Sequence, residues 1–214
     1  MKPIPWLGWI NVSLFVMAII GGVFQAIEQA EAEVAVSGEG SKEIVVTIQD
    51  LSLEDEVAAF ARGDSLWNEQ KREEAVAEYR EVVQGVEVSG LEAEAQYKIG
   101  LYYITLGDWD QADAAFQQVL EGHPTDVTTT PWAEYSLAWL DIHRNKFQSA
   151  IAKFQAVIDK GISKDKELYA YAYYYIGKIY IAFLHDKAKA DAAFQKVLEK
   201  YPDSKPAKRH FWLK

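Results

Sequence analysis

The chain has 214 residues, half of them hydrophobic, and no cysteine, which is enough for one ordinary domain with an appendage. The lack of thiols excludes disulfides, thiolate metal sites and a lipid anchor on cysteine. The net charge of −10 is uneven: residues 27–121 carry 22 acidic and 6 basic side chains, and residues 122–214 carry 10 and 15. This asymmetry is either an uneven solvated surface or two distinct docking faces, and the acidic half argues against a nucleic-acid partner.

The N-terminal residues 1–27 contain one long apolar run. From Trp6 to Ile27 there are 22 residues without charge, which as a helix would span about 33 Å, close to the thickness of a membrane's hydrocarbon core. We expect a transmembrane signal anchor; the alternative is a signal peptide, because Ala30-Glu31-Ala32 has the small-x-small form of a cleavage site. The residues expected in the membrane include Trp6, Trp9, Leu14, Phe15, Val16, Ile19, Ile20 and Phe24.

The charges on either side of this run predict its orientation. Lys2 precedes it and acidic residues follow it, so the N-terminus should be cytoplasmic and the rest extracytoplasmic. We therefore expect a single-pass protein of a bacterial inner membrane with a periplasmic domain. Cleavage would instead give a secreted or periplasmic protein.

Residues 28–53 are expected to be a linker. The segment SGEGS at 37–41 has the composition of a flexible linker, whereas EIVVTI at 43–48 has the composition of a strand. No second strand pattern lies beside it, so an extended tether and a strand added to a partner's sheet are both open.

From residue 54 the sequence becomes helical and repetitive. Phe116, Phe154 and Phe194 are separated by 38 and 40 residues, and Tyr79 precedes Phe116 by 37. An alanine stands four residues before each ring and a valine three residues after it, so the three positions share one helical face. Such a face cannot be covered by one helix pair, whereas stacked pairs bury a continuous core.

The residues around these helices resemble the tetratricopeptide repeat. The second copy has Ile99-Gly100, Tyr103, Gly107-Asp108-Trp109, Ala112, Phe116 and Pro124, and the fourth has Tyr173, Ile176-Gly177, Tyr180, Ala190, Phe194 and Pro202. The third departs from the pattern, since Asp141 and Asn145 replace the expected aromatic residue and glycine, and the first, with Gly63, Leu66, Ala75 and Tyr79, is degenerate.

This resemblance implies an all-α solenoid of about four helical hairpins over residues 54–203. Residues 204–214 would then be a C-terminal capping helix or tail, in which Phe211 and Trp212 either close the end of the fourth repeat or contact a partner.

In tetratricopeptide repeats, the second, fifth, ninth, twelfth and thirteenth places of the first helix line a concave groove. Read in that register, the sequence predicts a groove rich in aromatic rings, with no Lys and Asn pair to clamp a terminal carboxylate. The alternative is that first helices of adjacent repeats bury these rings against each other. The predicted partner-binding residues are Phe60, Trp67, Tyr97, Leu101, Trp132, Tyr135, Trp139, Tyr171, Tyr174 and Lys178.

No catalytic or metal-binding motif occurs in the sequence. The four histidines lack a second ligand at helical spacing, and there is no phosphate loop, nucleophile elbow or dinucleotide fingerprint. We expect no enzyme activity, no cofactor, no metal and no small-molecule substrate.

The expected function is that of a protein–protein interaction scaffold, as an extracytoplasmic subunit or accessory factor of a membrane-associated complex. The alternatives are a transient periplasmic assembly factor or holdase for envelope or translocated proteins, and a self-assembling scaffold whose oppositely charged halves stack.

Overall fold

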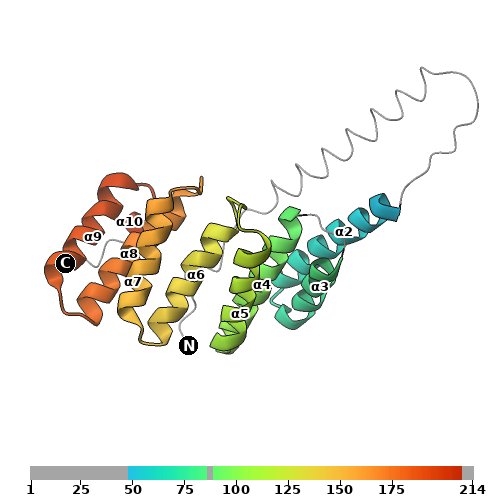
Figure 1. Cartoon of the computed structure of the whole chain (residues 1–214), viewed down its shortest axis with the longest axis horizontal. Helices are drawn as coiled ribbons and strands as arrows, with labels where there is room; N and C mark the ends of the chain where they lie inside the picture. The colour runs from blue at the N-terminus through green and yellow to red at the C-terminus, as the bar shows by residue number, and fades with distance from the viewer. Residues whose placement is uncertain (1–47, 86–88, 209–214) are drawn as a thin grey trace, which may run out of the picture.

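The computed structural model describes residues 48–85 and 89–208, and within these ranges every regular element is a helix (Figure 1). The helices are α2 (Ile48–Asn68), α3 (Arg72–Gln84), α4 (Ser89–Leu106), α5 (Trp109–Gly122), α6 (Thr130–His143), α7 (Phe147–Lys160), α8 (Lys166–Ala182), α9 (Lys187–Lys200) and the short α10 (Lys205–Lys208).

The first eight of these helices form four antiparallel hairpins, α2–α3, α4–α5, α6–α7 and α8–α9, which we number one to four. Each helix packs mainly on its neighbours in sequence, and the hairpins follow one another along the long axis of the molecule (Figure 1). The all-α solenoid predicted from the repeats is therefore confirmed.

The solenoid begins earlier than the predicted boundary at residue 54. Helix α2 begins at Ile48, so the last six residues of the predicted linker are helical; two of them, Leu51 and Leu53, are good helix formers. Residues 1–47, which hold the predicted anchor and the rest of the linker, lie outside the described residues. Among the helices of 48–85 and 89–208, none combines the length and apolarity needed to cross a bilayer.

Each hairpin is held together by one pair of aromatic rings, one from each helix. The ring centroids are separated by 5.7 Å for Phe60/Tyr79, 5.4 Å for Tyr97/Phe116, 5.1 Å for Tyr135/Phe154 and 6.1 Å for Tyr174/Phe194. Ring pairs at these separations stabilise the contact beyond the area that they bury. The same packing thus recurs in all four hairpins.

A glycine in the first helix makes room for the ring of the second helix. A Cβ atom added at Gly100 would lie 2.5 Å from the Phe116 ring, and one added at Gly177 would lie 2.4 Å from the Phe194 ring. In both hairpins the glycine therefore allows a close approach of the two helices.

The turn inside each hairpin contains one residue in the left-handed conformation. These residues are Gln70, Gly107, Asn145 and His185, with φ of 68°, 74°, 58° and 53°. Asn145 stands where the repeat pattern expects glycine, and asparagine is among the side chains that tolerate this conformation best. Asparagine in place of the expected glycine therefore leaves the turn of hairpin three intact.

Helix α10, a single turn, lies at the start of residues 204–214, which the sequence predicts to be a capping helix or a tail. Two side chains cap the N-terminus of α10. The Ser204 hydroxyl accepts a hydrogen bond from Ala207 N–H at 3.3 Å, and the Glu167 carboxylate of α8 accepts one from Lys205 N–H at 3.0 Å. Ala207 is buried against α8 and α9. Phe211 and Trp212 lie outside the described residues.

Candidate functional site

The predicted aromatic groove is largely filled by the chain itself. Trp67, Trp132 and Tyr174 are half-buried and Lys178 is exposed. The prediction of an open, ring-lined surface is wrong for the six other residues, which are buried: Phe60, Tyr97, Leu101, Tyr135, Trp139 and Tyr171.

The rings are covered by the first helix of the next hairpin. Lys98 Nζ lies 4.9 Å from the Phe60 ring centroid, Ser136 Oγ lies 3.4 Å from Tyr97 Oη, and the Tyr175 ring lies 6.2 Å from the Tyr135 ring. In each case the covering residue directly follows the fifth-place ring of its own hairpin. The alternative of packing between adjacent first helices therefore holds at these positions.

A half-buried polar cluster lies where the groove was predicted, between α2 and α4. Lys98 forms ion pairs with Asp64 and, at 3.5 Å, with Glu94, and Tyr79 Oη donates a hydrogen bond to Asp64 at 2.7 Å. Burial raises the pKa of Glu94. The cluster is internally paired, so it serves to join hairpins one and two.

Within the described residues, the part of the predicted groove that is most exposed lies on hairpin four, which is not followed by another full-length helix. Helix α8 presents three residues in this direction, Tyr174, Lys178 and Ile181, which we call the terminal face. Ile181 is 43% exposed, and the Lys178 ammonium group lies 5.7 Å from the Tyr174 ring centroid. Only the single turn of α10 follows α8 and α9 within the described part of the chain.

A second apolar surface lies along the edge formed by the turns inside the hairpins. It contains Leu106 and Trp109 of hairpin two, His143 and Phe147 of hairpin three, and Phe183 of hairpin four; we call it the turn-edge row. Leu106 and Phe183 are among the most exposed large apolar side chains, at 59% and 46%.

Ring contacts connect this row from hairpin to hairpin. Trp109 stacks on His143 with centroids 4.9 Å apart, and Phe147 stacks on Phe183 at 4.2 Å with an angle of 15° between the planes. His143 also contacts the Trp139 ring at 3.8 Å, and burial lowers the pKa of its imidazole. The row is therefore a fixed surface rather than a set of isolated side chains.

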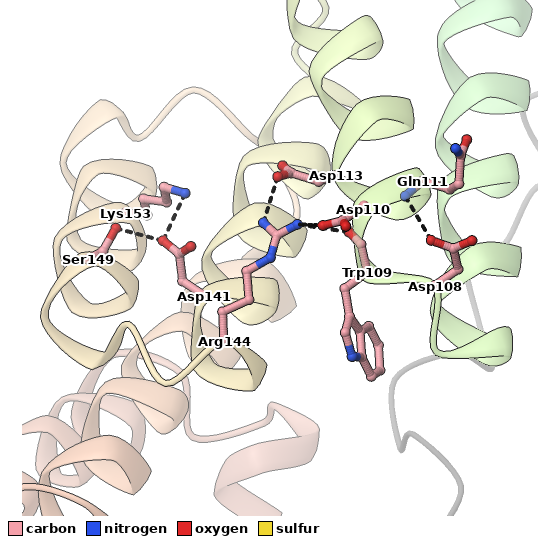
Figure 2. Close-up of polar contacts among 9 residues, drawn as sticks. All are labelled: Asp108, Trp109, Asp110, Gln111, Asp113, Asp141, Arg144, Ser149 and Lys153. Atoms are coloured by element: carbon pink, nitrogen blue, oxygen red, sulfur yellow. Dashed lines mark hydrogen bonds and ion pairs between the residues drawn. The ribbon is translucent and has the colours of Figure 1, made fainter.

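Polar contacts hold Trp109 in place (Figure 2). Arg144, which follows α6, donates hydrogen bonds to Asp113 at 2.6 Å, to Asp110 at 2.8 Å and to the Trp109 carbonyl at 3.2 Å. Charge-assisted, forked contacts of this kind fix both distance and orientation. Arg144 thereby joins the turn of hairpin three to the start of α5.

The buried carboxylate of Asp141 explains the departure of hairpin three from the repeat pattern (Figure 2). It accepts a hydrogen bond from Ser149 Oγ at 2.6 Å and pairs with Lys153 at 2.8 Å, both from α7. Burial alone would raise the pKa of Asp141, but the hydrogen bonds from Lys153 and Ser149 outweigh it and keep the pKa below its usual value. A polar bridge thus replaces the expected aromatic contact.

Sequence reasoning missed the turn-edge row because its members lie at helix ends. Leu106 is the last residue of α4 and Phe183 directly follows α8, so both lie beyond the periodic positions that define a helical face. In the described ranges no group of three or more His, Asp or Glu side chains is arranged to hold a metal ion. The features that the described geometry offers to a partner are therefore the terminal face and the turn-edge row.

Comparisons with known proteins agree with this architecture. A family model described as tetratricopeptide repeat matches residues 94–126 and 171–204, which are α4–α5 and α8–α9. No curated protein sequence matches the chain.

Solved structures match over most of the chain. MamA from Desulfovibrio magneticus RS-1 is 21% identical, with a TM-score of 0.53 over 69% of this chain and 76% of that one. YrrB, described as a tetratricopeptide protein with an unusual peptide-binding site, is 20% identical, with a TM-score of 0.52 over 72% of each chain. PilF of Pseudomonas aeruginosa is 16% identical, with a TM-score of 0.53 over 75% of this chain and 67% of that one. Over residues 48–85 and 89–208 the chain is therefore an all-helical solenoid, and two of its segments match the tetratricopeptide repeat.

Proposed function

We propose that the protein is a non-catalytic interaction scaffold that contacts a protein partner through the turn-edge row. The observation that carries this proposal is that two stacked ring pairs, Trp109/His143 and Phe147/Phe183, lie at the turns of hairpins two to four together with the exposed side chains of Leu106 and Phe183. Aromatic and large aliphatic side chains dominate the energetics of protein interfaces. Because Trp109 and Phe147 are already fixed by ring contacts, binding would cost little side-chain entropy.

The cellular setting of the proposal rests on the sequence. The uncharged run from Trp6 to Ile27 would anchor the chain in a bacterial inner membrane, with the solenoid in the periplasm. A flexible tether over the 20 residues 28–47 would have an r.m.s. length of about 25 Å, which raises the effective concentration toward neighbouring membrane proteins. We therefore propose a subunit or accessory factor of a membrane-associated complex.

The experiment compares two matched pairs of substitutions in the full-length protein in its native membrane. Leu106→Ser with Phe183→Ser changes the turn-edge row, whereas Val127→Ser with Ile162→Ser changes two similarly exposed residues at the opposite edge. We expect the first pair to lose the proteins that copurify in mild detergent and the second pair to retain them, while the circular dichroism spectra of both variants show that the helices remain folded. Equal copurification with both pairs would refute the role of the row.

Two alternatives to a permanent subunit remain as competing proposals. Size-exclusion after mild detergent extraction separates them: a permanent subunit gives a complex of fixed stoichiometry, a transient assembly factor gives a free monomer, and a self-assembling scaffold gives oligomers that dissociate in salt.

The opposite charges of the two ends favour self-assembly, but the side chains exposed on the first hairpin do not. Residues 48–85 carry 10 acidic and 4 basic side chains, and residues 163–208 carry 6 and 9, so the two ends attract. Within residues 55–68, however, the outer face of α2 exposes small or polar residues, which is typical of a solubilising end cap. These residues are Ala58, Ala61, Arg62 and Ser65.

A further inference from the structure

The edge that carries the turn-edge row is acidic along one half and basic along the other. The comparison takes the five residues that begin at the left-handed residue of each turn, which are 70–74, 107–111, 145–149 and 185–189. In these segments hairpins one and two have four acidic and two basic side chains, and hairpins three and four have one acidic and three basic, a net charge of −2 against +2. The exposed members of the majority sign are Glu73, Glu74, Asp108 and Asp110 on the acidic half, and Lys146, Lys187 and Lys189 on the basic half.

Ion pairs at the turns leave this difference in place. Lys187 pairs with Asp191 at 2.7 Å and Lys189 pairs with Asp186 at 3.0 Å, but the two lysine side chains are 78% and 63% exposed. On the acidic half, Asp110 is 94% exposed although it pairs with the arginine that follows α6. Exposed pairs of this kind are weak, so these charges still attract an opposite charge on a docked molecule.

We propose that the partner seated on the turn-edge row is a second copy of this chain, placed edge to edge and turned end for end. The inference rests on the function proposed above, because it takes the row as the contact surface. A two-fold axis between hairpins two and three places hairpin one of each copy opposite hairpin four of the other, and hairpin two opposite hairpin three. Each acidic half then faces a basic half, whereas copies side by side in the same direction would place like charges together.

The same arrangement covers apolar side chains of the row. The Trp109/His143 ring pair joins hairpins two and three and therefore lies at the axis. Leu106 of hairpin two, which is 59% exposed, faces hairpin three of the second copy, where Phe147 begins α7. Phe183 stacks on Phe147 at 4.2 Å and lies beside this contact. Because the axis repeats the contact, both copies bury their rows at once.

A two-fold contact of this kind is closed. It uses the same surface on both copies and ends at a dimer, whereas stacking of the oppositely charged ends of the solenoid would continue into a filament. It also leaves the outer face of α2 free, whose small and polar side chains argue against stacking end to end.

The test uses full-length chains with two different affinity tags, expressed together and extracted in mild detergent. An acidic variant carries Lys187→Glu with Lys189→Glu, and a basic variant carries Glu73→Lys with Glu74→Lys. Two unaltered copies should be captured together. Two copies of the acidic variant, or two of the basic variant, should be captured together at least about tenfold less, because like charges face each other. One acidic and one basic copy should be captured together as well as unaltered copies, because opposite charges then meet at both contacts.

Recovery of the mixed pair also shows that both variants fold. As a control, Lys196→Glu with Lys200→Glu reverses two exposed charges of α9 away from its turn and should leave capture unchanged. Full capture of the like pairs, or a mixed pair as low as the like pairs, would overturn the proposal.

The row variant separates this proposal from the function on which it rests. Leu106→Ser with Phe183→Ser should abolish the capture of one copy by another. If unaltered copies are not captured together but this variant loses a different copurifying protein, the row remains a contact surface and the second copy is not its occupant. If the variant loses neither, both proposals are wrong.

Discussion

The close approach of the two helices in hairpin two leads to a quantitative prediction for Gly100→Ala. The added methyl group would lie 2.5, 2.8 and 2.9 Å from Cε1, Cδ1 and Cζ of Phe116. Carbon atoms in contact prefer about 3.5–4.0 Å, so the ring must retreat by about 1 Å. Phe116 is completely buried in the main core cluster, so the packed side chains around its ring oppose this movement.

Two opposing effects decide the size of the change. Overpacking of a tight core costs about 1–3 kcal/mol, and the blocked ring places this site at the upper end. Alanine is favoured over glycine within a helix by about 1 kcal/mol. The net destabilisation should be about 2 kcal/mol, or a loss of about 4–8 °C in melting temperature for a chain of this size.

Thermal melts of Gly100→Ala and Gly122→Ala test this reasoning. Gly122 lies at the end of α5, and an added Cβ there meets nothing within 4 Å, so its substitution should be neutral or slightly stabilising. In a Phe116→Leu background, the cost of Gly100→Ala should fall to near zero because the ring edge is gone. An equal cost in both backgrounds would show that the contact with Phe116 is not the cause.

Three further predictions concern the turns of the solenoid. Arg144→Ala should lower the free energy of unfolding in urea by about 1 kcal/mol, and by less at high salt, because the forked contact between hairpins is lost while the side chain of Arg144 is partly solvated in the folded protein. As a control, Lys187→Ala removes an exposed ion pair and should change the free energy of unfolding by less than about 0.5 kcal/mol. Asn145→Ala should cost about 1 kcal/mol in thermal melts because its φ is 58°, whereas Asn145→Gly should be tolerated. Burial lowers the pKa of His143 in the folded state. The stability that neutral His143 contributes is therefore fully present above the unfolded-state pKa of about 6.5 and is lost as the pH falls through the lower folded-state pKa. His143→Phe removes this titration, so the melting temperature should decrease less below about pH 6.5.

The fold could be predicted from the sequence because the repeated places are those that bury side chains within a hairpin. Ala112, Phe116 and Val119 define one helical face, and all three are completely buried. Such positions depend on contacts a few residues apart along a helix, which periodicity reports directly.

The state of the groove could not be predicted in the same way. Periodicity places Tyr97 and Tyr135 on the inner side of their helices, but it does not give the distance to the next first helix. That distance depends on the residues following each ring, and Ser136 and Tyr175 show no periodic signal of their own. The rings are therefore core residues, although they hold the places of ligand-binding residues in the repeat register.

The position of the turn-edge row has a consequence for how a partner would act on the molecule. The row that we propose as a partner's contact surface also joins successive hairpins, through the ring pairs Trp109/His143 and Phe147/Phe183. A partner that covers both ring pairs would bind the stacked arrangement and not a separated one, so binding and hairpin stacking must be thermodynamically linked. At a partner concentration 100 times its Kd, this linkage would stabilise the stacked solenoid by about 2.7 kcal/mol. A buried groove and a binding edge are therefore compatible: close packing between hairpins creates the edge, and occupation of the edge reinforces the packing.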